Sequence, residues 1–153
     1  MLGIIHGGLR RLFAAALVFT LVGSAHAAGI AGAPAPFDKG GVNIALVGYM
    51  FSGDFPEAYL RGVEKQSAAL GINLRLFDAR QQAATQREML EQAIDLGVDG
   101  IIIQLGLAET LKDTVAKAVA KGIKVVAFDV DLGNPQVTQV EQDHHELARL
   151  ALG

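Results

Sequence analysis

The sequence predicts an α/β fold, a doubly wound parallel sheet in three Rossmann-like layers, on three observations. Short β-rich runs alternate with segments of helical periodicity from Val42 onward. Three helical segments end at Gly71, Gly97 and Gly122, at intervals of 26 and 25 residues, and Ile or Val follows each glycine directly. The strand runs are nearly continuous in apolar residues, as expected where helices cover both faces of a sheet. This alternation is typical of right-handed βαβ units.

Residues 1–27 have the pattern of a secretory signal peptide. Arg10 and Arg11 precede an apolar run from Leu12 to Val22, and Ala25-His26-Ala27 has the small-x-small form of a cleavage site. A membrane anchor would need about 20 apolar residues, and this run is roughly half as long. We therefore expect export to the periplasm, cleavage after Ala27 and no stable membrane insertion of the mature chain.

Composition and charge exclude several classes of function. The chain has 153 residues, which suits one domain, and contains no cysteine, which excludes thiol catalysis and thiolate zinc sites. Loss of residues 1–27 would leave 11 basic and 16 acidic residues, a net charge of −5. Such a chain does not suit a nucleic-acid backbone, so nucleic acid is not an expected partner.

Residues 28–41 are rich in alanine, proline and glycine and show no periodicity, which is typical of a flexible leader. The domain itself is expected to span residues 42–153. Its first four strands are predicted over residues 42–49, 72–77, 98–104 and 123–128. A short strand over 137–140 and a helix over 143–152 are expected to follow.

The helices between the strands are predicted from apolar positions at helical spacing. The first is expected to start at Pro56, because proline is favoured in the first turn of a helix. The positions expected to face the sheet are Tyr59, Leu60, Val63 and Leu70 in the first helix, Met89, Leu90, Ala93 and Ile94 in the second, and Leu111, Val115, Ala118 and Val119 in the third.

The loops at the carboxyl ends of the strands hold the candidate site residues, because ligands of open parallel sheets bind there. The loop after the first strand carries Phe51, Ser52 and Phe55. Each phenylalanine alone is equally explained as a cap on the core. Two of them in one exposed loop, with a hydroxyl between, favour a binding surface.

Acidic side chains follow the fourth strand. Asp129 comes directly after an apolar strand, where a carboxylate needs hydrogen-bonding partners, and we interpret it as ligand-binding. Asp131 is equally explained by a turn with the glycine, asparagine and proline that follow it. Asp143 stands at the start of the last helix and is a further candidate. Asp78, after the second strand, is better explained as a loop residue paired with Arg80.

Three motifs of enzymes and metal sites are incomplete. Residues 143–146, Asp-His-His-Glu, do not converge on a metal, because adjacent helical residues point about 100° apart. Residues 128–131, Phe-Asp-Val-Asp, match the start of haloacid-dehalogenase-type phosphatases, but no lysine follows them. Residues 48–54 have glycines five apart without the G-K-[ST] of a nucleotide loop. We expect no metal, no cofactor and no catalytic residue.

The order and spacing of several segments resemble the periplasmic sugar-binding proteins of ABC transporters, the ribose- and galactose-binding type. The resemblance covers residues 42 to about 152, and it implies the first lobe of a type I periplasmic binding protein that delivers a monosaccharide or similar polyol to a permease. The segments that carry it are Val42–Val47, Ser52–Pro56, Gly62, Leu70–Leu74, Asp95–Ile103 and Lys121–Asp129.

The resemblance also implies roles for individual residues. Phe55 falls where the family stacks an aromatic ring on the sugar, and Asp129 falls where a carboxylate accepts hydrogen bonds from sugar hydroxyls. Ser52 and Gln104 match more weakly. Pro56 stands where the family often has a second aromatic residue, and Val130 where it often has an arginine, so the particular sugar stays open.

The length of the chain departs from this family, whose members enclose the ligand between two lobes. We expect an incomplete single lobe that binds sugar weakly. The same fold would also serve a periplasmic sensor for a chemoreceptor or histidine kinase, or a small flavodoxin-like or phosphatase-like enzyme. The ligand domain of a repressor is disfavoured, because a signal peptide stands where a DNA-binding segment would be.

Overall fold

The computed structural model describes residues 29–152, and the predicted signal peptide lies outside them. Five parallel strands form one sheet in the order β2-β1-β3-β4-β5. This arrangement confirms the predicted fold class. The strands are β1 (Asn43–Gly48), β2 (Asn73–Asp78), β3 (Gly100–Gln104), β4 (Lys124–Phe128) and β5 (Thr138–Val140).

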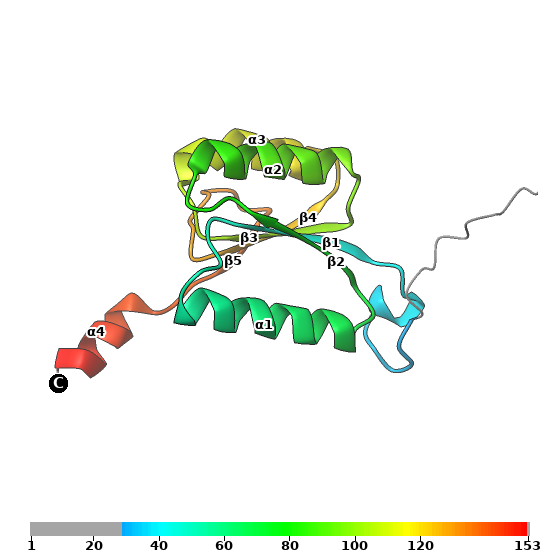
Figure 1. Ribbon diagram of the computed structural model, residues 1–153, viewed down its shortest axis with the longest axis horizontal. Helices are drawn as coiled ribbons and strands as arrows, with labels where there is room; N and C mark the ends of the chain where they lie inside the picture. The colour runs from blue at the N-terminus through cyan, green and yellow to red at the C-terminus, as the bar shows by residue number, and fades with distance from the viewer. Residues whose placement is uncertain (1–28, 153) are drawn as a thin grey trace, which may run out of the picture.

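The helices lie on both faces of this sheet, as Figure 1 shows. Helices α2 (Ala83–Asp95) and α3 (Ala108–Ala120) cover one face, and α1 (Asp54–Ala69) covers the other. Helix α4 (His144–Leu152) projects away from the sheet at the end of the chain. We refer below to the α2/α3 face and the α1 face.

Helix α1 begins at Asp54, two residues before the predicted start at Pro56. The first intrahelical bond runs from the N–H of Glu57 to the carbonyl oxygen of Gly53 (3.0 Å). Pro56 is therefore still within the first turn, where N–H groups have no partner in the helix, so its missing donor costs nothing. The glycines that were expected to end helices do so, with φ of 61° at Gly71 and 66° at Gly97.

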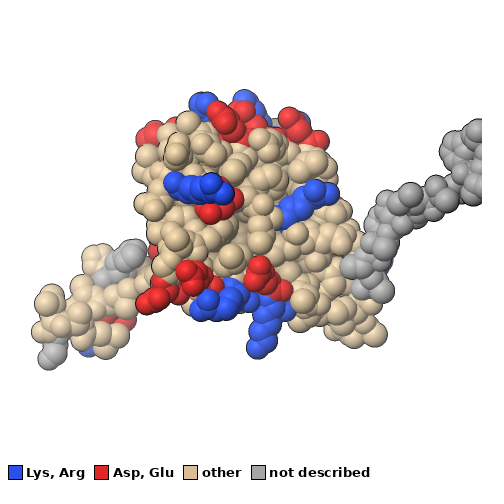
Figure 2. Space-filling model, in the orientation of Figure 1, with Lys and Arg blue, Asp and Glu red and all other residues tan. Residues whose placement is uncertain are grey.

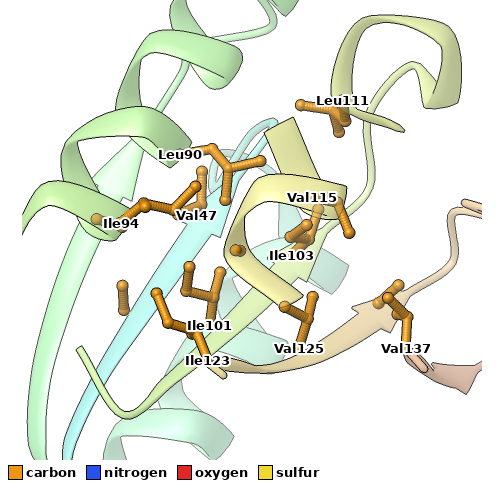
Figure 3. Close-up of a cluster of buried hydrophobic side chains, with 14 of the residues drawn as sticks. Val47, Leu90, Ile94, Ile101, Ile103, Leu111, Val115, Ile123, Val125 and Val137 are labelled. Atoms are coloured by element: carbon orange, nitrogen blue, oxygen red, sulfur yellow. The ribbon is translucent and has the colours of Figure 1, made fainter. Parts of the chain in front are cut away.

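The main core lies between the sheet and helices α2 and α3, as Figure 3 shows in close-up. Sheet residues that point to this face are almost fully buried, and the predicted apolar positions of α2 and α3 pack on them. This cluster includes Ala45, Val47, Leu90, Ala93, Ile94, Ile101, Ile103, Leu111, Val115, Ala118, Val125 and Ala127, with Met89 and Val119 partly buried against it.

The predicted apolar positions of α1 face the sheet but are only half-buried. Tyr59, Leu60, Val63 and Leu70 all keep part of their surface exposed, and only Pro56 and Ser67 of this helix are buried. A single helix cannot cover five strands, because a helix with its side chains is about 10 Å across and strands lie about 4.8 Å apart.

Residues 29–41, expected to be a flexible leader, contain hydrogen-bonded turns and the short 3₁₀ helix η1 (Phe37–Lys39). The N–H of Ala33 donates to the carbonyl oxygen of Ile30 (3.0 Å), and the N–H of Ile30 donates to the carbonyl oxygen of Phe37 (3.4 Å). Proline and glycine, which suggested flexibility, are also the residues that tight turns require.

Candidate ligand-binding site

The carboxyl ends of the strands place five residues in one row across the sheet. Register pairs Asp78 with Gly48, Gly48 with Gln104, Gln104 with Phe128 and Phe128 with Val140. Because side chains alternate along a strand and Val47 and Ile103 belong to the other face, this row points to the α1 face. The site is therefore built where the first turn of α1 meets the ends of β1, β3 and β4.

An aromatic cluster occupies this corner. The ring of Tyr59 stacks on Phe128 with centroids 4.6 Å apart and planes at 24°, and Phe55 lies beside Phe128 at 6.3 Å and 22°. Burial raises the pKa of the Tyr59 hydroxyl. Phe55 remains 53% exposed, so one aromatic ring of the cluster faces solvent on a rigid base.

Phe128 was missing from the sequence-based candidates, although its neighbour Asp129 was included. It ends a strand that reads as uniformly apolar, so nothing in the pattern separates it from core residues such as Val125. Only the alternation of the strand, once its buried face is known, shows that Phe128 points to α1.

Phe51 lies on the end of β1. A Cβ atom at Gly48 would stand only 2.2 Å from Cζ of the Phe51 ring, so the ring fills the space that a side chain at position 48 would take. Phe51 is half-buried in this position. Ser52, next in the loop, is exposed.

Gln104 is fully buried at the end of β3, next to Gly48 in the register. Its side-chain Nε2 and Oε1 atoms have no hydrogen-bond partner among residues 29–152, while its backbone oxygen accepts from the N–H of Tyr49 (2.8 Å). A buried amide without partners is costly and is uncommon in folded proteins.

Asp129 is half-buried and has a φ of 58°, in the left-handed region that residues with a Cβ seldom adopt. The four described non-glycine residues with positive φ are Arg80, Gln81, Leu105 and Asp129, and all lie just after β2, β3 or β4. Strained backbone thus gathers at the carboxyl edge of the sheet. Such strain concentrates at ligand sites, where the surrounding fold holds it in place.

The other acidic candidates accept hydrogen bonds from nearby backbone. Oδ1 of Asp131 accepts from the N–H of Gly133 (2.8 Å), and Oδ1 of Asp143 accepts from the N–H of Glu146 (2.9 Å). Both side chains belong to exposed residues, and these bonds are those of a turn and a helix cap. The aromatic residues, Gln104 and Asp129 gather at β1, β3 and β4, whereas Asp143 stands at the start of the projecting α4.

Asp78 was expected in a loop, but it is the last residue of β2 and pairs with Gly48. Its Oδ1 atom accepts from the backbone N–H of Arg80 (3.0 Å), so the two residues are joined through the main chain.

Gln86 supports the site from α2, and sequence reasoning did not find it. It is fully buried, and its Nε2 donates to the carbonyl oxygen of Leu105 (3.0 Å) and reaches that of Val47 (3.5 Å). A Cβ at Gly106 would stand 2.4 Å from Oε1 of Gln86. Gln86 therefore holds the loop after β3 close to β1. The available signal was a polar residue four positions before the core residue Leu90.

A surface cavity of about 330 Å³ lies between α2 and α3, lined by Glu91, Ile94, Asp95, Lys117 and Lys121. These residues lie toward the carboxyl ends of α2 and α3, which run antiparallel to the strands, so the cavity is at the opposite edge of the sheet from Phe55 and Gln104. Two of its four charged side chains, Lys121 and Asp95, form an exposed ion pair (3.8 Å). The carboxyl edge is therefore the better candidate for the site.

Charge and metal chemistry add little at this edge. On the face that Figure 2 shows, acidic and basic side chains are interspersed over the described residues. Between residues 29 and 152, no three His, Asp or Glu side chains gather in a way that could hold a metal ion. Within the same range, none of the helices combines the length and apolar character that crossing a membrane requires.

The observed fold is the fold of the known proteins that the chain resembles. The periplasmic binding protein domain family matches residues 44–152. The chain belongs to this family. None of the curated protein sequences matches the chain.

Solved structures of the family share the fold with the chain. The solute-binding protein of a 5-methylthioribose transporter from Thermotoga lettingae, in complex with 5-methylthioribose, is 36% identical over 67% of the chain, with a TM-score of 0.65. A sugar ABC transporter protein from Yersinia enterocolitica is 28% identical over 72% (TM-score 0.65), and LsrB from Clostridium saccharobutylicum, in complex with AI-2, is 25% identical over 71% (TM-score 0.63). The matched part is 32%, 35% and 34% of those chains, so this chain spans about a third of their length.

Proposed function

We propose that this chain captures a monosaccharide or a similar small polyol for an ABC importer, here as an incomplete single lobe, and that it is not an enzyme. The observation that carries the proposal is the exposed ring of Phe55 stacked on Phe128, the residue directly before Asp129 at the carboxyl edge. A sugar presents C–H faces to an aromatic ring and hydroxyls to a carboxylate, and this edge offers both.

The remaining candidate residues complete a polyol site at the same edge. Gln104 offers a donor and an acceptor without partners, and Ser52 offers an exposed hydroxyl in the loop with Phe51. Asp131 and Asp143 are proposed as outer contacts of a ligand that extends toward β5. The related proteins that hold 5-methylthioribose and AI-2 support a small ligand of this kind.

The single lobe is expected to bind weakly. Ligand pockets bury most of a small ligand's surface, and one lobe presents a single wall of such a pocket. The chain spans about a third of the length of its structural relatives, which is consistent with residues 29–152 providing one such wall. We therefore expect a dissociation constant in the millimolar range, which corresponds to about 4 kcal/mol of binding free energy.

The family and the N-terminal pattern support a periplasmic protein. We propose that residues 1–27 direct export and are removed after Ala27, and that the partner of the loaded protein is a transporter permease. The intact mass of the chain recovered from the periplasm tests the cleavage. A mass that includes residues 1–27 would contradict it.

Titration with sugars and polyols, followed by NMR, tests the binding proposal. We expect D-ribose, 5-methylthioribose or myo-inositol to shift amide signals around Gly48, Gln104 and Asp129 at millimolar concentration. Phe55→Ala or Asp129→Ala should abolish the shifts and leave the melting temperature within about 2 °C of the parent chain, as expected of substitutions that remove little packing.

Asp113→Ala is the matched control, because Asp113 is an exposed carboxylate on α3, outside the site. It should leave every shift unchanged. Unchanged binding by either site variant would remove that residue from the site, and a micromolar dissociation constant would contradict the single-wall argument. The lack of any shift with any polyol would overturn the proposed function of this chain.

A further inference from the structure

The position of the Phe51 ring against Gly48 affects how a ligand reaches the site. Gly48 belongs to the row of residues that points to the α1 face, between Asp78 and Gln104. Any side chain at this position would collide with the Phe51 ring, since even a Cβ would lie 2.2 to 2.7 Å from three of its atoms. Glycine at position 48 is therefore what lets the ring lie flat on the sheet edge.

The Phe51 ring lies against Gly48, and the residue beside Gly48 in the row, Gln104, carries an unpartnered side-chain amide. Register places Gln104 directly beside Gly48 on the neighbouring strand and on the same face. Both polar atoms of its side chain are buried and have no partner among residues 29–152. Because burial without hydrogen bonds is unfavourable, a group that can bond to this amide would be favoured in the space beside Gly48.

The loop that carries Phe51 is weakly held. Met50, Phe51 and Ser52 lie outside helices and strands, and their backbone groups make no hydrogen bond to another described residue. Gly53, which follows them, has a φ of 101° that glycine adopts without strain. The ring can therefore leave Gly48 without breaking a strand or a helix.

We propose that Phe51 is an internal competitor of the ligand: its ring occupies the position over Gly48 and Gln104 that a sugar ring takes, and it has to leave before Gln104 can bond to sugar hydroxyls. This inference rests on the proposed function and assigns Phe51 a role opposite to that of Phe55. Phe55 supplies a surface on which the ligand stacks, whereas Phe51 lowers the apparent affinity and the on-rate, because both scale with the fraction of time that the amide is uncovered.

Two substitutions remove the competitor in different ways. Phe51→Ala deletes the ring, and Gly48→Ala expels it by placing a Cβ where the ring lies. Partial burial of the Phe51 ring lowers the free energy of the state in which the ring lies on Gly48, so we expect that state to be populated most of the time. We therefore expect both variants to bind D-ribose or 5-methylthioribose about tenfold more tightly than the parent chain, with a faster on-rate.

The experiment has one arm without ligand and one with ligand. Without ligand, the side-chain amide protons of Gln104 should change their NMR shift in Phe51→Ala and in Gly48→Ala, because the ring current of Phe51 is lost, and should exchange faster with water. Unchanged shifts would overturn the inference, since the ring would not cover the amide. Phe37→Ala, in η1 at the far edge of the sheet, is the control and should change neither quantity.

In the arm with ligand, Phe51→Ala is compared with Phe55→Ala. Tighter binding by the first and weaker binding by the second support the inference. Weaker binding by both would overturn it and make Phe51 a second stacking surface. No binding by the parent chain or by Phe51→Ala overturns the proposed function as well, whereas binding by the parent chain without a gain in Phe51→Ala overturns this inference alone. If Gly48→Ala does not fold, Phe51→Ala decides.

Discussion

The two faces of the sheet are packed very differently. On the α2/α3 face, strand residues such as Val47, Ile103 and Ala127 are fully buried under two helices. On the α1 face, Leu46 of the central strand β1 is fully buried, but Ile102 and Val126 are half-buried and Leu76 is 45% exposed. One face thus carries the dense core that stabilises the fold, and the other is left open enough for solvent and ligands to reach.

The difference shows why the candidate site lies where it does. Phe128, Gln104 and Gly48 all point to the α1 face, at the edge where the first turn of α1 begins. This edge combines the exposed ring of Phe55 and the half-buried ring of Phe128 with the fully buried Gln104. The α2/α3 face contributes indirectly, because Gln86 holds the loop after β3 from that side.

The largest expected effect separates the two faces by stability. Leu90 is fully buried between α2 and the sheet, so Leu90→Ala should lower the free energy of unfolding by about 2–5 kcal/mol through lost packing and the cavity it leaves. Leu76→Ala, on the open face, should lower it by under about 1 kcal/mol, because much of that side chain is already in water. Urea denaturation measures both values.

Equal losses of unfolding free energy in Leu90→Ala and Leu76→Ala would contradict the difference in packing between the two faces. They would mean that the α1 face is covered in solution as completely as the α2/α3 face. A fall in the m-value for either variant would show instead that the unfolding is no longer two-state, and the comparison would then be made by hydrogen exchange.

The fold could be predicted because several independent signals in the sequence agree. Apolar runs such as Ile101–Ile103 indicated buried parallel strands, and Gly71, Gly97 and Gly122 marked helix ends with φ of 61°, 66° and 82°. Boundaries were less certain, as Pro56 shows, because a proline is tolerated at more than one position of a first turn. The local sequence pattern predicts whether a segment is a helix or a strand more reliably than it predicts the residue at which the segment begins.

The site was predicted only in part, because its geometry depends on contacts between distant segments. Phe51 was identified as an aromatic residue of the loop, but its contact with Gly48 depends on how the loop folds back onto β1. Phe128 and Gln86 were missed for a related reason. Each looks ordinary within its own segment, and each gains its role from a partner, Tyr59 for Phe128 and Leu105 for Gln86.

A smaller effect tests the support that Gln86 gives to the loop after β3. Gln86→Leu keeps the volume of the side chain but leaves the carbonyl oxygen of Leu105 without its donor, and should lower the free energy of unfolding by about 1–3 kcal/mol. Gln92→Leu, on the exposed side of the same helix, should change it by under about 0.5 kcal/mol. Thermal and urea unfolding of the two variants give the comparison.

Amide hydrogen exchange shows which part of the structure loses stability in Gln86→Leu. Faster amide exchange confined to Leu105 and Gly106 would show that Gln86 positions this loop. Faster exchange throughout α2 would contradict that role and make Gln86 an ordinary part of the core.

The smallest expected effect is a pH dependence on the α1 face. Burial raises the pKa of the Tyr59 hydroxyl above its usual value of 10.0, so the folded state favours the neutral form. The contribution of Tyr59 to stability is therefore fully present below pH 10 and is lost as the pH rises through the folded pKa. Tyr59→Phe retains the ring that stacks on Phe128 and removes the ionisable group.

The difference in stability between the parent chain and Tyr59→Phe should stay constant up to about pH 9 and then shift in favour of the variant as the pH rises further. Taking the difference cancels the contributions of ionisable groups that are the same in both chains. A difference that stays flat to pH 11 would mean that water reaches the Tyr59 hydroxyl freely in the folded state. The stack on Phe128 would then be a surface contact, and the α1 face would be more open than its half-buried side chains indicate.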